Sequence, residues 1–244
     1  MPDPADTGRL GQADLIRKLV LANRILAKHG VVDGFGHVSV RTGDADGSFY
    51  LSRSLAPARV TRDDIMRFDL DGHPQDGDTR APYLERFIHG EIYRVRPDVE
   101  SIVHNHSPSV IPFGATRRPL KPLYHMSAFL SLGSAHFEIR DAGGNTDMLV
   151  RDGKLGAALA RSLGSASVVL MRGHGCTVVG TSIEQVVFRS IYTELNARLQ
   201  IQAHALGDPN FLNAEEAEKA TRSMDATLSR AWALWAVEVE AESG

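Results

Sequence analysis

Two histidines near the middle of the chain have the spacing of a preformed half of a metal site. In a β-strand, side chains two residues apart point to the same face, so His104 and His106 should project together while Asn105 points away. The apolar run before them predicts a buried strand over 101–106 that leads into a loop, and α/β proteins commonly place ligands at such strand ends. Imidazole is the commonest metal ligand. The pair therefore predicts two ligands of a divalent cation, with two separately hydrogen-bonded histidines as the alternative.

His174, in the sequence RGHGC, is the candidate for a third ligand. Its glycine neighbours allow a tight turn, and we expect a strand on either side to hold the imidazole in place. Three neutral histidines with an open position are typical of a catalytic rather than a structural divalent site. A turn histidine without a ligand is the alternative. Cys176 would share a face with His174 in an extended strand, but a free cysteine is more typical of a packed core.

Glu85 lies on the helix predicted before the histidine strand. A carboxylate beside a divalent cation can complete the coordination or move protons, and the pattern does not choose between these roles. His89 follows four residues later on the same helix face, so an ordinary exposed pair is the alternative.

The elements that must position these residues alternate between helices and strands, as in an α/β domain. Apolar periodicity predicts helices over 12–29, 83–95, 155–163, 183–205 and 214–239, and strands over 37–41, 49–52, 101–106 and both arms of 167–180. Thr61 and Asp64 match a capping box, and Asp152 is expected to cap the helix that follows it. We expect mixed strand and loop over 123–132 and 136–140. Neither a linker nor a repeat divides the sequence, so a single domain over 1–244 is predicted.

Composition excludes several classes of function. The 244 residues are 43% hydrophobic and carry a formal net charge of −3, which offers no overall field for attracting nucleic acid or anionic lipid. No apolar run approaches the roughly 20 residues of a membrane-spanning helix. One cysteine and a start without a basic, apolar leader favour the cytoplasm. The 10 histidines are the unusual feature of the chain.

The segment YLERFIHGEIYRVRPDVESIVHNHSPSVIPFG at 83–114, with GHVSVR before it and LMRGHGCTVVG after it, resembles the class II aldolase/adducin family over about 12–205. The resemblance implies a three-layer αβα sandwich on a central, mainly antiparallel sheet, and a homotetramer with active sites at subunit interfaces. It also implies one divalent cation per subunit on His104, His106 and His174, zinc or manganese with cobalt or iron as alternatives. Glu85 precedes His104 by 19 residues, which implies the family's catalytic acid/base role.

The chain departs from the sugar-phosphate aldolases of this family at the places that hold the phosphate. Small hydrogen-bond donors are largely replaced there by larger or apolar residues, in the pairs Gly36-His37, Ser54-Leu55 and Tyr83-Leu84. His125 stands at the place of the aldolases' catalytic tyrosine, which changes the ordinary pKa of the proton donor from about 10 to about 6.5. These changes argue against a phosphorylated sugar as the substrate.

The phrases YLERFIHGEIYRVRPDV and LYHMSAFL are similar to a branch that includes metal-dependent decarboxylases of hydroxylated aromatic or pyridine dicarboxylates. Decarboxylation and aldol cleavage both leave an electron pair on carbon, which a divalent cation on an adjacent oxygen stabilises. The resemblance implies that the metal chelates a carboxylate and an ortho hydroxyl group of a small carboxylate substrate. After CO2 leaves, Glu85 or His125 would protonate the ring carbon.

Candidates for gripping the substrate are His37, Arg53 and Ser54, whereas we expect surface salt bridges for Arg41 and Arg86. Three alternatives to a decarboxylase remain. A class II aldolase would release an aldehyde from a hydroxy-ketone. A non-catalytic, adducin-like binding module would have lost the ligand histidines, and an oxygenase would hold iron on the same three histidines.

Overall fold

The protein is built on one seven-stranded sheet, seen in a computed structural model that describes residues 11–241. The strand order is β3-β2-β1-β4-β7-β6-β5, and every neighbouring pair is antiparallel except β5 and β6. The strands are β1 (His37–Arg41), β2 (Phe49–Ser52), β3 (Ile65–Phe68), β4 (Ser101–Asn105), β5 (Ala135–Phe137), β6 (Val168–Met171) and β7 (Gly175–Gly180). The prediction of a mainly antiparallel sheet is confirmed.

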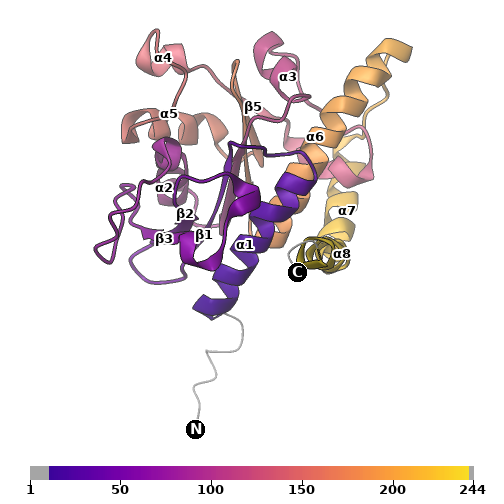
Figure 1. The fold of residues 1–244 in the computed structure, drawn as a ribbon. Coiled ribbons are helices and arrows are strands. Elements are labelled where there is room, and N and C mark those ends of the chain that lie inside the picture. The colour runs from indigo at the N-terminus through magenta and orange to yellow at the C-terminus, as the bar shows by residue number, and fades with distance from the viewer. Residues whose placement is uncertain (1–10, 242–244) are drawn as a thin grey trace.

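Helices cover both faces of the sheet (Figure 1). On one face α2 (Phe87–Val95) packs beside α5 (Gly153–Leu163), and on the other face α1 (Gln12–Lys28) packs beside α6 (Ile183–Leu206) and α8 (Leu228–Ala241). The alternation of side chains along each strand divides the buried apolar residues into two cores. Phe49 and Leu51 of β2 face the first helical layer, whereas Val38 and Val40 of β1 face the second. The predicted three-layer αβα sandwich is confirmed.

Short elements complete the described chain. They are the helices α3 (Ile111–Thr116), α4 (Ile139–Gly143) and α7 (Ala214–Asp225) and the 3-10 turns η1 (Pro57–Arg59), η2 (Arg62–Asp64), η3 (Leu84–Arg86) and η4 (His125–Leu132). The predicted capping box of Thr61 and Asp64 is present at η2, and Asp152 caps α5 through the backbone N–H of Leu155. Among residues 11–241, no helix is long and apolar enough to cross a membrane.

Two predicted elements differ from the structure. The segment 123–132 contains no strand, because its polar groups are bound by Asn196 of α6: the side-chain oxygen accepts hydrogen bonds from Leu123 N and Ser127 Oγ, and the segment winds into η4. The single helix predicted over 214–239 is broken between α7 and α8. The backbone N–H and the hydroxyl of Thr227 both donate to the carbonyl oxygen of Met224. These local hydrogen bonds replace the regular helical pattern, and apolar periodicity does not reveal them.

The centre of the sheet aligns the side chains that matter for chemistry. His104 of β4 lies opposite His37 on β1 and opposite Thr177 on β7, so the three form a row across one sheet face. Asn105 points to the other face, as predicted, and its side-chain oxygen accepts a hydrogen bond from Cys176 Sγ at 3.3 Å. The sheet thus presents one row of polar side chains, His37, His104 and Thr177, on the face toward α2.

Candidate metal centre

Four predicted side chains converge where β4 ends. Glu85, His104, His106 and His174 each direct one ligand atom to a common region, and these atoms lie within 4.8 Å of one another. The Nε2 atom of His106 is 3.2 Å from that of His104 and 3.0 Å from that of His174. Glu85 Oε2 is 3.4 Å from Nε2 of both His104 and His174. Residues far apart in the sequence therefore form one compact donor set.

The donor set fits a divalent cation. Metal–nitrogen bonds of about 2.0–2.1 Å place neighbouring ligands about 3.4 Å apart at tetrahedral corners and about 3.0 Å apart at octahedral ones. The separations of 3.0–3.4 Å fall in this range. Three imidazoles and one carboxylate suit zinc, manganese, cobalt or iron, and the distances do not select among them.

Hydrogen bonds behind the ligands set the orientation of two imidazoles. The Nδ1–H of His174 donates to the backbone oxygen of Met148 at 2.8 Å. His104 Nδ1 is 3.3 Å from Thr177 Oγ1, and because the Thr177 hydroxyl donates to Met171 Sδ, this oxygen is the acceptor of the His104 Nδ1–H. Each bond leaves the Nε2 lone pair directed at the common region, as a metal ligand requires. Burial, followed by the charges of His104 and His174, lowers the pKa of His106 to about 4, which keeps this ring neutral near pH 7.

Glu85 sits at a kink that aims its carboxylate. Its backbone (φ −92°, ψ 20°) departs from helical geometry at the junction of η3 and α2. One carboxylate oxygen accepts the backbone N–H of Val150 at 2.9 Å, and the other faces the histidines. Burial alone raises the pKa of Glu85, but the charge and hydrogen bonds of His104, with those of His174, outweigh it and hold the pKa below its ordinary value. Glu85 is therefore ionised in the resting protein.

His37 borders the centre, and His89, which the sequence reasoning left as ordinary, lies directly behind it. The ring of His37 is 5.1 Å from that of His104, and its Nδ1 is 2.6 Å from His89 Nε2. The alternative of an exposed Glu85–His89 pair is wrong, because the His89 side chain is fully buried. The sequence signal available was the helical spacing of residues 85 and 89, which predicts that both side chains point to the same side.

Arg53 and Ser54 follow the end of β2 and are not members of the four-residue donor set. Arg53 Nε lies 2.6 Å from Asp64 Oδ1, and the backbone N–H of Ser54 donates to the oxygen of Ala81. They approach the centre through Tyr83, whose hydroxyl donates to the oxygen of the residue after Ser54 and whose ring is 4.7 Å from that of His37. The contact with His37 is therefore made by Tyr83, and Arg53 and Ser54 lie outside the donor set.

The salt bridges expected for two arginines are wrong. Arg41 donates to the backbone oxygens of Tyr93, Arg96 and Val99, and so satisfies carbonyl groups around the end of α2. Arg86 donates to the backbone oxygens of Gly72 and Tyr83. Backbone carbonyl groups that lack a partner in a helix or strand compete with carboxylates for guanidinium donors. The sequence does not show where these carbonyl groups lie. Cys176 is fully buried in the core, as favoured, and lies outside the donor set.

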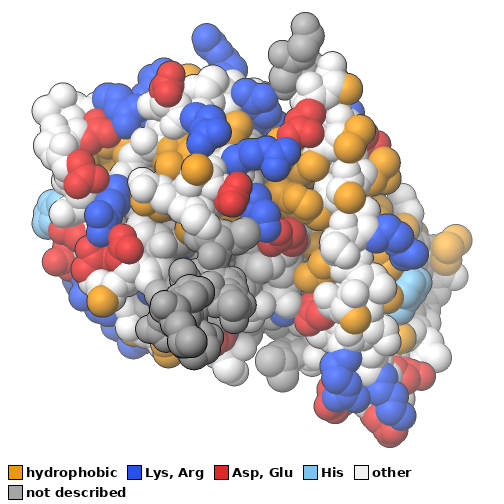
Figure 2. All heavy atoms as spheres, turned by 90° about the horizontal axis from the view of Figure 1, so that it is seen from below, with side chains coloured by type: hydrophobic (Ala, Val, Ile, Leu, Met, Phe, Trp, Pro, Cys, Tyr) orange, Lys and Arg blue, Asp and Glu red, His pale blue; other side chains and the backbone are white. Residues whose placement is uncertain are grey.

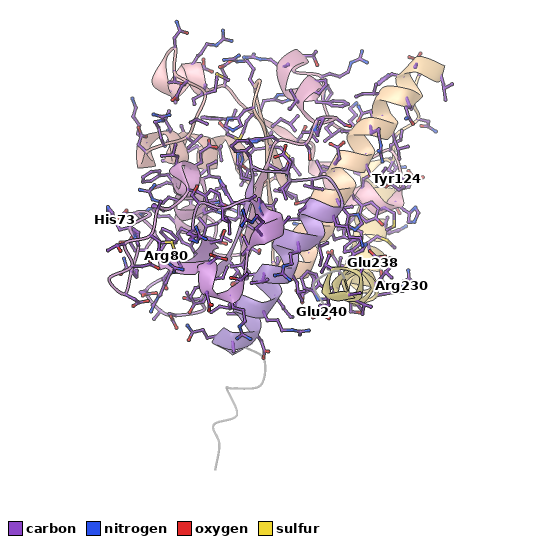
Figure 3. All side chains as sticks on the ribbon, viewed as in Figure 1. His73, Arg80, Tyr124, Arg230, Glu238 and Glu240 are labelled. Carbon is purple, nitrogen blue, oxygen red and sulfur yellow. The ribbon has the colours of Figure 1, made fainter. Side chains whose placement is uncertain are left out.

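His125 lies away from the other predicted site residues. It begins η4, which packs against α6 and α7, and its side chain is exposed. Its ring contacts that of Tyr124, which Figure 3 labels beside α6, at a centroid distance of 5.9 Å. Within one chain His125 is not part of the four-residue donor set.

Two large apolar side chains near the centre are exposed and were not predicted. Phe35 is 69% exposed with its ring 6.4 Å from that of His106, and Leu84, the residue before Glu85, is 57% exposed. Phe35 is held by a tight turn in which its backbone N–H donates to Asp33 Oδ1 at 2.9 Å. The metal centre therefore has an apolar border open to solvent in the single chain.

Comparison with known proteins places this geometry in context. The sequence profile of the Class II Aldolase and Adducin N-terminal domain matches residues 17–201. The chain is 38% identical to the protein named decarboxylase tropJ of Talaromyces stipitatus, over 92% of this chain and 94% of that protein. It is 33% identical to a 3,4-dihydroxyphthalate decarboxylase of Arthrobacter keyseri, over 78% of each chain. The fold matches the structure of L-fuculose 1-phosphate aldolase from Glaciozyma antarctica with a TM-score of 0.78 and 24% identity, over 96% of this chain and 91% of that one.

Proposed function

The chain belongs to the class II aldolase and adducin family, and from this premise we propose that it is a divalent-metal-dependent carbon–carbon lyase that decarboxylates a hydroxylated aromatic or heteroaromatic carboxylate. One observation carries the proposal: three imidazole nitrogens and a carboxylate oxygen lie within 4.8 Å of one another at the end of β4. The names of the two similar decarboxylases support the reaction, and the name of the second, a 3,4-dihydroxyphthalate decarboxylase, supports a dicarboxylate as the substrate class. The intact ligand set argues against a non-catalytic, adducin-like module.

One divalent cation per subunit, zinc or manganese, held by His104, His106 and His174, would supply a Lewis acid that stabilises the electron pair left when the bond to CO2 breaks. Glu85 is the proposed acid/base residue. Because it is ionised, it can accept the proton of the substrate hydroxyl and return it to the ring carbon. The reaction takes up one proton for each CO2 released, and His125 is the second candidate donor to the ring carbon.

The substrate carboxylates need a polar grip, and we assign it to His37 with Arg53 and Ser54. His37 lies next to the ligand His104, which supports direct contact with a substrate bound there. Arg53 is already engaged by Asp64, so we expect it to contribute positive potential rather than a full ion pair.

The test is an assay of the zinc-loaded and manganese-loaded protein with ortho-hydroxylated aromatic dicarboxylates, beginning with 3,4-dihydroxyphthalate. We expect CO2 release and a product shorter by one carboxyl group, both measured by mass spectrometry. If none of these compounds reacts and a hydroxy-ketone is cleaved to an aldehyde, the protein is an aldolase. The aldolase is the second candidate because the same donor set stabilises the electron pair of either cleavage.

We also propose a homotetramer with active sites at its subunit interfaces. Phe35 and Leu84 leave apolar surface open beside the metal centre, and α8 exposes Leu234 and Val237. Apolar side chains lie among charged side chains of both signs on the face seen from below (Figure 2). Contiguous exposed apolar surface is typical of interaction sites. Native mass spectrometry of the metal-loaded protein tests the assembly, and a monomer would contradict it.

A further inference from the structure

Behind the metal centre, four side chains outside the donor set form one continuous hydrogen-bonded chain. The Tyr93 hydroxyl is 2.8 Å from Ser39 Oγ, which is 2.6 Å from His89 Nδ1, and His89 Nε2 is 2.6 Å from His37 Nδ1. The four residues are at most 3% exposed. They come from β1 and α2, and the chain ends at the imidazole that contacts the ligand His104.

Geometry limits the protons in this chain. Two imidazole nitrogens 2.6 Å apart can share only one proton, so one of His37 and His89 donates and the other accepts. His37 is 3% exposed and His89 is fully buried, and their ring nitrogens face each other and Ser39 rather than a carboxylate, so a positive charge on either ring would be buried without a hydrogen-bonded counter-charge. Both rings are therefore neutral, each with one N–H and one bare nitrogen. The bonds run either toward His37, which pairs every donor of the chain, or away from it, which leaves the hydroxyl proton of Ser39 or of Tyr93 without a further partner among residues 11–241.

The Tyr93 end decides the direction. If the bonds ran toward Tyr93, its own hydroxyl proton would need a further acceptor, and Ser39 is the hydrogen-bond partner of this hydroxyl among residues 11–241. The guanidinium of Arg41 lies 4.6 Å from the ring centroid and has donors only. The carboxylate of Glu100 acts on Tyr93 through its charge and forms no hydrogen bond with this hydroxyl among the described residues. A buried donor without an acceptor costs about 1–3 kcal/mol. The bonds therefore run from Tyr93 through Ser39 and His89 to His37.

This direction defines the state of the last ring. His89 donates its Nε2–H to His37 Nδ1, which leaves the proton of His37 on Nε2, on the side of the ring turned away from His89. We propose that Tyr93, Ser39 and His89 are positioning residues that lock His37 as a neutral Nε2–H donor beside the metal centre. This inference rests on the proposed function: the group that accepts the hydrogen bond from His37 Nε2–H is a carboxylate oxygen of the bound substrate.

The tautomer can be read directly by magic-angle-spinning NMR of zinc-loaded protein with ¹⁵N-labelled histidine. His37 is assigned by the signal that disappears in His37→Gln. We expect both His37 and His89 to carry their proton on Nε2. A His37 proton on Nδ1 in the wild-type protein would overturn the proposal.

A matched pair of variants tests the lock. Ser39→Ala removes the hydroxyl through which Tyr93 sets the direction, so the His37 Nδ1–H tautomer should appear and the KM for the substrate should rise about two- to fivefold as the competent fraction falls, with kcat nearly unchanged. Ser101→Ala is the control: it also deletes a fully buried hydroxyl on the sheet, one that donates to the backbone oxygen of Ser39 at 2.7 Å. It should leave the tautomer and KM unchanged.

Each result bears on one part of the proposal. An unchanged tautomer in Ser39→Ala rejects the lock, and a mixed tautomer with an unchanged KM rejects the contact with substrate. The wild-type protein could show no decarboxylation of any compound tested while His37 still carries its proton on Nε2. In that case the proposed function fails and the lock stands.

Discussion

The two oxygens of the Glu85 carboxylate have different surroundings. One is fixed by the backbone N–H of Val150, and the other faces two histidines. A carboxylate held in this way can move a proton at one oxygen without rotating, which suits acid/base work better than free coordination. The residue therefore combines a structural contact with the acid/base role that we propose for it.

Replacing Glu85 by Gln separates these roles. The amide oxygen can still accept the Val150 N–H, but the side chain no longer takes up a proton, so kcat should fall about 10²–10⁴-fold while metal content stays the same. Steady-state kinetics with metal analysis measures both. Glu91→Gln on the same helix, where the carboxylate pairs with Arg94, is the control and should keep its kcat. An unchanged kcat in Glu85→Gln would remove the proton-transfer role.

His106 is the candidate ligand whose ring is held by the fewest hydrogen bonds. No hydrogen bond from its Nδ1 is found among the described residues, unlike those of His104 and His174. Its substitution by Ala should abolish metal binding and activity together, because one of the three proposed imidazole ligands is lost. Metal content after dialysis and turnover are the measurements, with His29→Ala as control, because His29 is exposed and belongs to neither cluster of possible metal ligands among the described residues. Stoichiometric metal in His106→Ala would take His106 out of the ligand set.

At the scale of elements, the close pairing of β4 and β7 brings His106 and His174 together. Gly175 lies against β4 so closely that an added Cβ would overlap the backbone oxygen of Asn105 and stand 2.9 Å from His106 Cα. The glycine after His174 is therefore needed because two backbones approach each other closely there. The glycines on either side of His174 in the sequence had indicated such an approach.

Gly175→Ala should push the strands apart. We expect a loss of about 1–3 kcal/mol in the free energy of unfolding and weaker metal binding, because the ligands sit on the two separated backbones. Denaturant titration and metal affinity are the measurements. Gly34→Ala, where an added Cβ meets nothing within 4 Å, should change neither. Full stability in Gly175→Ala would show that the two strands can separate without cost.

The parts of the site that could be predicted are those that local spacing determines. An i, i+2 pair on a strand and a glycine-flanked turn indicated His104, His106 and His174, because strand geometry fixes which side chains share a face. The chain from Tyr93 to His37 could not be predicted in the same way, since its members meet only when α2 packs on β1. The η4 turn was missed for a related reason, because Asn196 of a distant helix decides its conformation.

At the scale of the whole molecule, one chain brings together the proposed metal ligands but does not bring His125, the second proposed proton donor, into their cluster. His125 is exposed on η4, whereas Glu85 and the histidines lie at the end of β4. A symmetric assembly can bring a residue of one subunit to a site of the next, since the same two surfaces recur around the ring. Exposed Phe35 beside the centre provides apolar surface for such a contact.

Mixing two inactive variants tests this arrangement. His125→Ala keeps its metal ligands and His106→Ala keeps His125, so hybrid tetramers formed after dissociation and reassembly should contain some complete sites. With equal amounts and random assembly, we expect about a quarter of the wild-type turnover. A complete site needs the metal ligands of a His125→Ala subunit and His125 from a neighbouring His106→Ala subunit, and each is present with a probability of about one half. Turnover of each variant alone, taken through the same reassembly, is the control. Absence of recovery in hybrids that native mass spectrometry shows to be mixed would mean that His125 does not act across the subunit boundary.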